Sequence, residues 1–167
     1  MDINFLAVLV AAIVPMAMGF IWYNPKVLGN AWMKAAGLDE EKLKGANMVV
    51  IFGLSFVLSF LLAFFTQSLV IHQFHIGGAF FDYQEQIKDV NTPEGALFKQ
   101  VMDLVGTSHR TFKHGAFHGV LTGLFVITPI LATSAMFERK GFKYIAINAG
   151  YWIICLAIMG GIVSGWM

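Results

Sequence analysis

Residues 45–71 read GANMVVIFGLSFVLSFLLAFFTQSLVI and contain no Asp, Glu, Lys or Arg. A helix needs about 20 apolar residues to cross the hydrocarbon core of a bilayer. Three further stretches, residues 3–25, 115–137 and 144–167, are also free of these charged side chains. The sequence therefore predicts four membrane-spanning helices, over about residues 3–24, 46–74, 113–137 and 144–166.

The composition agrees with this prediction. The chain has 167 residues, of which 57% are hydrophobic and only 13% are charged. Soluble domains have about 25% charged residues. The four stretches use more than half of the chain, so we expect one transmembrane domain over residues 1–167, an all-α four-helix bundle in the lipid bilayer. Nothing in the sequence indicates nucleic-acid binding, because it has no basic tract.

The loops carry local helix signals. Residues 30–36 form a candidate short helix ended by Gly37, and Asp39 can cap a second one. In the long loop, residues 77–112, Thr92 and Pro93 are typical of a helix start, and Gly106 can end that helix. We expect these short helices at the membrane interface. The long-loop helix either lies on the membrane or packs on the end of the bundle.

The charges between the spans predict the orientation of the chain. With four spans, both termini and the 77–112 loop share one side of the membrane. The other side holds seven of the eleven Lys and Arg residues: Lys26, Lys34, Lys42, Lys44, Arg139, Lys140 and Lys143. Because Lys and Arg concentrate in cytoplasmic loops, we expect both termini and the long loop to be extracytoplasmic.

Glycines recur at helical spacing in the last two spans. Gly115, Gly119 and Gly123 are four residues apart, and Gly161 and Gly165 repeat this spacing. Small residues allow two membrane helices to approach closely. These glycines therefore predict tight helix packing, either within the chain or between subunits.

The histidines form the main group of candidate ligands. All five fall on the predicted extracytoplasmic side: His72, His75, His109, His114 and His118. His114 and His118 are one helical turn apart, and the ends of the second and third spans can bring four imidazoles together, those of His72, His75, His114 and His118. Neutral imidazole binds zinc, copper or iron. The alternatives are a proton-titrating or substrate-contacting role and ordinary hydrogen bonding in the headgroup layer.

Polar side chains within the spans form a second group. Asn148 and Tyr151 lie in the fourth span, and a carboxamide in hydrocarbon needs hydrogen-bond partners. We expect Asn148 to face hydroxyls of the third span: Thr122, Thr128, Thr133 and Ser134. Two interpretations are open, a polar contact between helices and the floor of a ligand pocket.

Several motifs resemble one known family. They are Trp22-Tyr23-Asn24-Pro25, residues 29–34, residues 37–41, residues 137–139, residues 148–151 and Gly160-Gly161. Together they resemble DUF1761, a family of small bacterial four-span membrane proteins of unknown function. The resemblance implies the four-span topology and a bacterial inner membrane, and it implies no activity. The 77–112 loop is longer than the resemblance leads us to expect.

The interiors of the spans contain no Asp, Glu, Lys or Arg, which argues against an ion-coupled pump or a voltage sensor. No acid–base set of a hydrolase is present either, so we expect no enzymatic activity and predict no cofactor. Our first hypothesis is a homo-oligomer, or an accessory subunit bound to other membrane proteins. The alternatives are a small-solute permease or channel formed by an oligomer, and a membrane protein whose histidines bind zinc, copper or haem.

Overall fold

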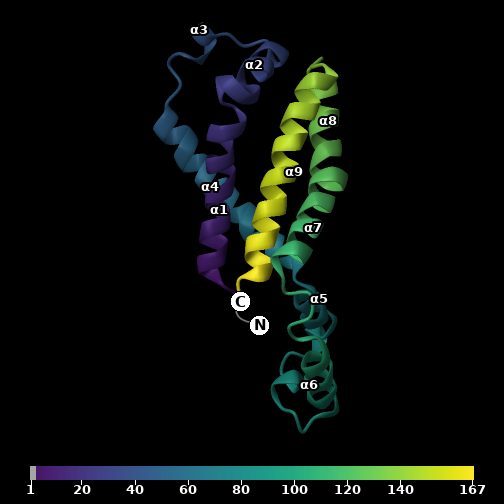
Figure 1. Ribbon diagram of the computed structural model, residues 1–167. Coiled ribbons are helices and arrows are strands. Elements are labelled where there is room, and N and C mark those ends of the chain that lie inside the picture. The colour runs from purple at the N-terminus through teal and green to yellow at the C-terminus, as the bar shows by residue number, and fades with distance from the viewer. Residues whose placement is uncertain (1–2) are drawn as a thin grey trace.

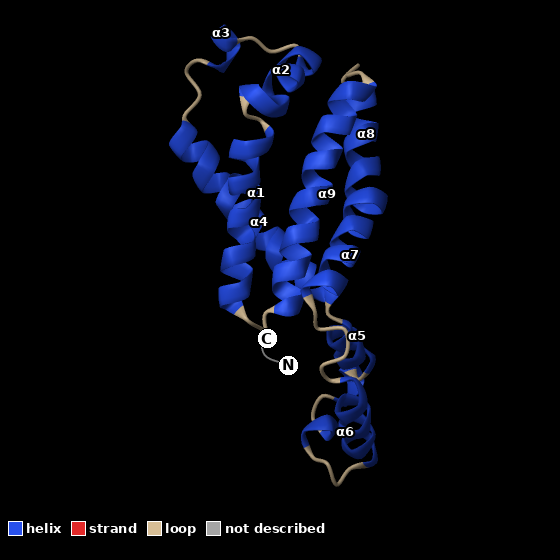
Figure 2. Cartoon of the chain, in the orientation of Figure 1, coloured by secondary structure: helices blue, strands red, loops and turns tan. Residues whose placement is uncertain are grey.

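The computed structural model describes residues 3–167, apart from the side chain of Glu40, and this part of the chain contains helices and no strand (Figure 2). The expected all-α fold is therefore confirmed. The elements in chain order are α1 (Phe5–Trp22), the π-helical turn η1 (Pro25–Gly29), α2 (Asn30–Ala36), α3 (Glu40–Leu43), α4 (Met48–Val70), α5 (His72–Ala79), the 3₁₀ turns η2 (Phe81–Tyr83) and η3 (Gln86–Lys88), α6 (Pro93–Val105), α7 (Phe112–Thr122), the π-helical turn η4 (Gly123–Ile127), α8 (Thr128–Phe137) and α9 (Phe142–Gly165).

Four helical segments of the described chain are long and apolar enough to cross a membrane: Phe5–Trp22, Met48–Val70, Phe112–Phe137 and Phe142–Gly165. The last, α9, packs against α1, α4 and α7 and supplies a larger share of the core than any other helix, including Cys155, Leu156 and Met159. In Figure 1, α9 lies between α1 on one side and the α7–α8 segment on the other.

Glycines allow α7 to pack directly on the backbone of α9. A Cβ atom on Gly119 would lie 2.1 Å from the carbonyl oxygen of Leu156, and one on Gly115 would lie 2.1 Å from that of Gly160. No side chain fits at either distance, so only glycine permits this approach. The ridge of small residues thus faces the interior of the chain.

The third span is interrupted by η4. Pro129 has no backbone N–H and would leave a carbonyl of the preceding turn unpaired in a regular helix. The chain widens into a π-helical turn just before this proline, and the Thr128 hydroxyl donates to the Gly123 carbonyl at 2.8 Å. The hydroxyl replaces a backbone donor, as is common beside prolines in membrane helices.

Local signals in the loops correspond to the helices observed. Gly37 ends α2 in the left-handed conformation with φ = 73°, and Asp39 caps α3 by accepting from Lys42 N. Thr92 caps α6 through Gly95 N, and Gly106 ends it. The short helices predicted in both loops are confirmed.

The region after the second span differs from the prediction. We expected one helix over residues 46–74, but α4 ends at Val70, Ile71 is extended, and His72 begins the separate helix α5. The polar side chains of His72 and Gln73 follow the last apolar turn, and Gln73 pairs with the long loop rather than extending the span.

The helix α6 lies beyond the end of the bundle. Figure 1 shows α5 and α6 extending away from the end of the bundle, with α6 packed on η3 and Phe98 against Phe80. The start of α1 and the end of α9 lie at this same end of the bundle, where Asn4 Nδ2 donates to the carbonyl of Trp166 at 3.4 Å.

Candidate metal centre

The break at Ile71 places one histidine at the edge of the bundle. Because α4 ends at Val70 and α5 starts directly afterwards, His72 is the first residue of a new helix. The start of α7 faces it. Thr111 caps α7 by accepting from His114 N at 3.2 Å, which positions the first turns of that helix.

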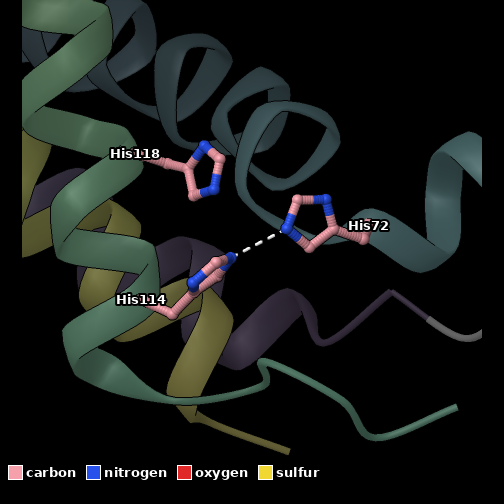
Figure 3. A group of neighbouring side chains, drawn as sticks. All are labelled: His72, His114 and His118. Atoms are coloured by element: carbon pink, nitrogen blue, oxygen red, sulfur yellow. Dashed lines mark hydrogen bonds between the residues drawn. The ribbon is translucent and has the colours of Figure 1, made fainter. Parts of the chain in front are cut away.

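The glycine face sets the rotation of α7. Gly115 and Gly119 each follow a histidine, and successive side chains of an α-helix are about 100° apart around its axis. Since the glycines are held against α9, His114 and His118 point to a neighbouring face. Figure 3 shows both imidazoles directed from α7 toward His72.

The three imidazoles form a compact group. Nε2 of His72 lies 2.8 Å from Nε2 of His114, a hydrogen-bonding distance. Taking one ring nitrogen from each of His72, His114 and His118, all three atoms lie within 4.8 Å of one another. All three side chains are half-buried. The three nitrogens can converge on one cation.

The two other histidines border this group. The ring of His109 stacks on that of His114, with centroids 4.7 Å apart, and the ring of His75 lies 6.3 Å from that of His72. His109 has φ = 63°, in the left-handed region that costs a non-glycine residue about 1–3 kcal/mol. The structure thus brings three of the four predicted imidazoles together, and His75 and His109 lie at the edge of that group.

Hydrogen bonds hold the loop that carries His109. Arg110 Nε donates to the carbonyl of Ser164 at 2.9 Å, which ties the loop to the end of α9. Ser164 in turn donates its hydroxyl to the His109 carbonyl at 3.5 Å. These contacts support the strained backbone of His109.

Gln73 is a contributor to this region that the sequence analysis did not identify. Its Nε2 donates to the carbonyls of Val105 at 2.7 Å and Ser108 at 3.2 Å. The side chain is only 2% exposed, and within residues 3–167 its Oε1 atom has no hydrogen-bond partner. The sequence signal that could have identified Gln73 was its position directly after His72, at the end of the apolar stretch.

The electrostatics favour neutral imidazoles. Burial lowers the pKa of His72 below its ordinary value of 6.5, and the nearby rings of His118, His109 and His75 lower it further. The group that can hold a metal consists of imidazoles alone, with no carboxylate or thiolate among the described residues. Neutral imidazole is the protonation state that binds metals.

Asn148 and Tyr151 have their hydrogen-bond partners away from the histidines. Asn148 accepts from the Tyr23 hydroxyl at 3.0 Å and donates to the Tyr144 carbonyl at 2.8 Å. The expectation that it would pair with hydroxyls of the third span is wrong, because the end of α1 lies nearer to it. Tyr151 donates to the Pro15 carbonyl at 2.6 Å.

The remaining predicted polar and glycine positions have local roles. Thr122 donates to the His118 carbonyl at 2.9 Å, within its own helix. A Cβ on Gly123 would lie 2.7 Å from Ile153 Cα. Gly161 and Gly165 both face Phe112 at the start of α7. All five predicted packing glycines therefore contact other parts of the same chain.

A family model described as "Protein of unknown function (DUF1761)" matches residues 6–164. No curated protein and no solved structure matches the chain. The match covers nearly the whole sequence and confirms the resemblance found in its motifs.

Proposed function

Because the chain belongs to the DUF1761 family, whose description assigns no activity, we propose a function from its own residues: it binds a divalent transition-metal ion through His72, His114 and His118. The observation that carries this proposal is the convergence of three ring nitrogens within 4.8 Å. They come from α5 and α7, elements on either side of the long loop.

The nitrogen–nitrogen spacings, 2.8 Å for the closest pair and up to 4.8 Å within the group, lie on both sides of the spacing in a metal site, so the side chains must shift to bind an ion. Zinc–nitrogen bonds of 2.0–2.1 Å in tetrahedral geometry place two ligand nitrogens about 3.3 Å apart. The His72–His114 pair, at 2.8 Å, is slightly closer than this. Without a metal, one of these two nitrogens donates a hydrogen bond and the other accepts it; to bind a cation through both, the donating ring takes the tautomer that carries its proton on Nδ1.

The ligand type limits the choice of metal. Imidazole suits zinc, copper, nickel and iron, whereas magnesium and calcium prefer oxygen ligands. Three histidines leave one position of a tetrahedral zinc site open to water or to another ligand. His109, stacked on His114, is the nearest protein candidate for that position. Zinc and copper are therefore the metals to test first.

The site lies at the membrane boundary. It is formed at the end of the bundle that carries the start of α1, the end of α9 and the α5–α6 extension (Figure 1). The excess of Lys and Arg in the opposite loops supports an extracytoplasmic position for this end in a bacterial inner membrane. A membrane-impermeant maleimide should label Asn91→Cys in intact cells, but not Lys34→Cys, both in a Cys155→Ser background.

Self-association or a role as an accessory subunit remains a separate prediction. The glycines that suggested it pack inside the chain, so they no longer support it. Light scattering of the purified protein, corrected for bound detergent, measures its mass directly. A monomer that binds zinc would leave the metal proposal intact and contradict the oligomer prediction.

Titration of the purified, metal-free protein tests the metal proposal. Zn²⁺ binding is followed by calorimetry, and Co²⁺ binding by visible absorption. We expect one ion per chain and a loss of affinity of at least about 100-fold in His114→Ala or His118→Ala, since even residues that only orient a ligand contribute 10–100-fold.

The matched control is His75→Ala. This exposed side chain lies at the same end of the bundle but outside the three-histidine group. We expect it to bind metal with nearly the affinity of the wild type. Equal affinities for wild type, His114→Ala and His118→Ala, or no binding to the wild type, would overturn the proposal.

A further inference from the structure

A large cavity lies away from the histidines, toward the end of the bundle that carries α2. Its volume is about 880 Å³, within the range of about 300–1,000 Å³ typical of ligand pockets. Its lining comes from all four spans, and includes Pro15 of α1, Ser55 of α4, Ile130 of α8 and Tyr151 of α9.

The wall of the cavity is predominantly apolar. The two tyrosines that line it have their hydroxyls bonded elsewhere, Tyr23 to Asn148 and Tyr151 to the Pro15 carbonyl. Both therefore present mainly ring surface. Apolar walls of this kind favour a hydrocarbon occupant over water.

The cavity opens toward lipid. Lining residues on three different helices are strongly exposed: Phe20 by 65%, Leu58 by 58% and Ile130 by 60%. Each belongs to a membrane-spanning segment. Since exposed side chains at this depth face acyl chains, the opening connects the cavity with the interior of the bilayer.

The length of the cavity fits one acyl chain. Along α4 the lining runs from Met48 to Leu62, which corresponds to about 21 Å of helix axis. The hydrocarbon layer of one leaflet is about 15 Å deep, half of the core thickness. A chain entering from this leaflet can therefore extend through most of the cavity.

The polar end of the cavity is basic. Asn24 and Pro25 line it, and the exposed Lys26 follows directly. The loops on this side of the bundle contain seven of the eleven Lys and Arg residues of the chain and four of its ten Asp and Glu residues, an excess of three positive charges. Basic residues attract anionic lipid headgroups. We propose that this cavity binds one acyl chain of an anionic phospholipid from the surrounding leaflet.

Native mass spectrometry of the detergent-purified protein, with phosphatidylglycerol and phosphatidylcholine supplied in equal amounts, tests this proposal. We expect one phosphatidylglycerol per wild-type chain. Ser55→Phe fills the cavity from α4 and should reduce retention at least tenfold. The control is Gly53→Phe on the same helix, because a Cβ there meets no atom within 4 Å and Gly53 does not line the cavity.

Gly19→Leu fills the cavity from α1 and is the second cavity-filling variant to test, in case Ser55→Phe does not fold. A Cβ at Gly19 lies 3.7 Å from the Tyr151 hydroxyl, an ordinary contact.

A second measurement uses nanodiscs that contain phosphatidylglycerol with brominated acyl chains, which quench tryptophan fluorescence on contact. Because Trp152 lines the cavity, we expect a larger fractional quenching in the wild type than in Trp152→Phe. Equal lipid retention in wild type and the cavity-filling variants, or equal retention of both lipids, would overturn the proposal.

Discussion

The Nε2 atoms of His72 and His114 lie 2.8 Å apart, although 42 residues separate the two histidines in the chain. The intervening segment forms the α5–α6 extension and returns to the bundle at α7. Hydrogen bonds of two residues connect the ends of this segment. Gln73 donates to the carbonyls of Val105 and Ser108. Arg110 donates to the carbonyl of Ser164 at the end of α9. The contact of the two imidazoles thus depends on the packing of the whole extension.

Zinc should stabilise the folded protein. A ligand that binds only the folded state at 100 times its Kd adds about 2.7 kcal/mol to the free energy of unfolding. We expect the Tm in detergent to rise with added Zn²⁺ in the wild type and in His75→Ala, but not in His118→Ala. An equal rise in all three proteins would indicate binding elsewhere.

The metal-free protein should lose stability on acidification. Burial lowers the pKa of His72, so the unfolded chain, with its ordinary pKa of 6.5, takes up a proton at a higher pH than the folded chain. The contribution of neutral His72 to the free energy of unfolding is therefore complete above about pH 6.5. It is lost as the pH falls through the lower pKa that His72 has in the folded state.

The corresponding measurement is the Tm between about pH 7.5 and pH 5. The groups around His72 are themselves imidazoles, those of His75, His109, His114 and His118. We expect His72→Gln to flatten the decrease of Tm and the exposed control His75→Gln to leave it nearly unchanged. The same slope in His72→Gln as in the wild type would contradict this explanation.

Gly119→Ala should destabilise the bundle. Its Cβ would lie 2.1 Å from the Leu156 carbonyl oxygen, so α7 must move away from α9. Overpacking of this kind costs about 1–3 kcal/mol. We expect a lower Tm and weaker zinc binding, because His118 moves with α7. In Gly53→Ala, where the added Cβ meets open space, both quantities should remain near their wild-type values.

Tyr23→Phe should weaken the contact between α1 and α9. The substitution removes the hydroxyl that donates to Asn148 Oδ1 at 3.0 Å and leaves that acceptor without this donor. Hydrogen bonds between membrane helices contribute about 0.6 kcal/mol on average. We expect a decrease of about this size in the free energy of unfolding, with zinc affinity unchanged. The exposed Tyr83→Phe should change neither.

Gln73→Leu should loosen the long loop without unfolding the spans. It removes both hydrogen bonds to the Val105 and Ser108 carbonyls. Hydrogen exchange should then accelerate in α6 and around His109, while α9 stays protected. The control is Gln84→Leu in the same loop, whose exposed amide donates to the nearby Phe80 carbonyl. Unchanged exchange in α6 would show that other contacts hold the extension.

Most of the secondary structure could be predicted because its signals are local. The start and end of α6 depend on Thr92 and Gly106, which act within a few residues. The end of α4 could not be predicted in the same way. Residues 71–74 contain no Asp, Glu, Lys, Arg, Gly or Pro that would mark a helix end, and the break at Ile71 is accompanied by Gln73 pairing with a loop more than 30 residues away.

The sequence identified His72, His114 and His118 as candidates together with His75 and His109, but it did not show which of the five histidines meet. Five histidines on one side of the membrane follow from counting spans, since each span reverses the direction of the chain. Which imidazoles meet depends on the rotation of α7, and this rotation depends on Gly115 and Gly119 resting on the backbone of α9. The spacing of the glycines indicated close packing but did not identify the partner helix.

The sequence by itself therefore determined the four membrane spans, the short loop helices and the family, because hydropathy and helix capping act over short distances along the chain. Only the tertiary structure decided that His72, His114 and His118 form one group, that Asn148 pairs with Tyr23, and that a cavity lies between the spans. These features are contacts between residues far apart in sequence. Their geometry is set by how the helices pack and rotate against one another.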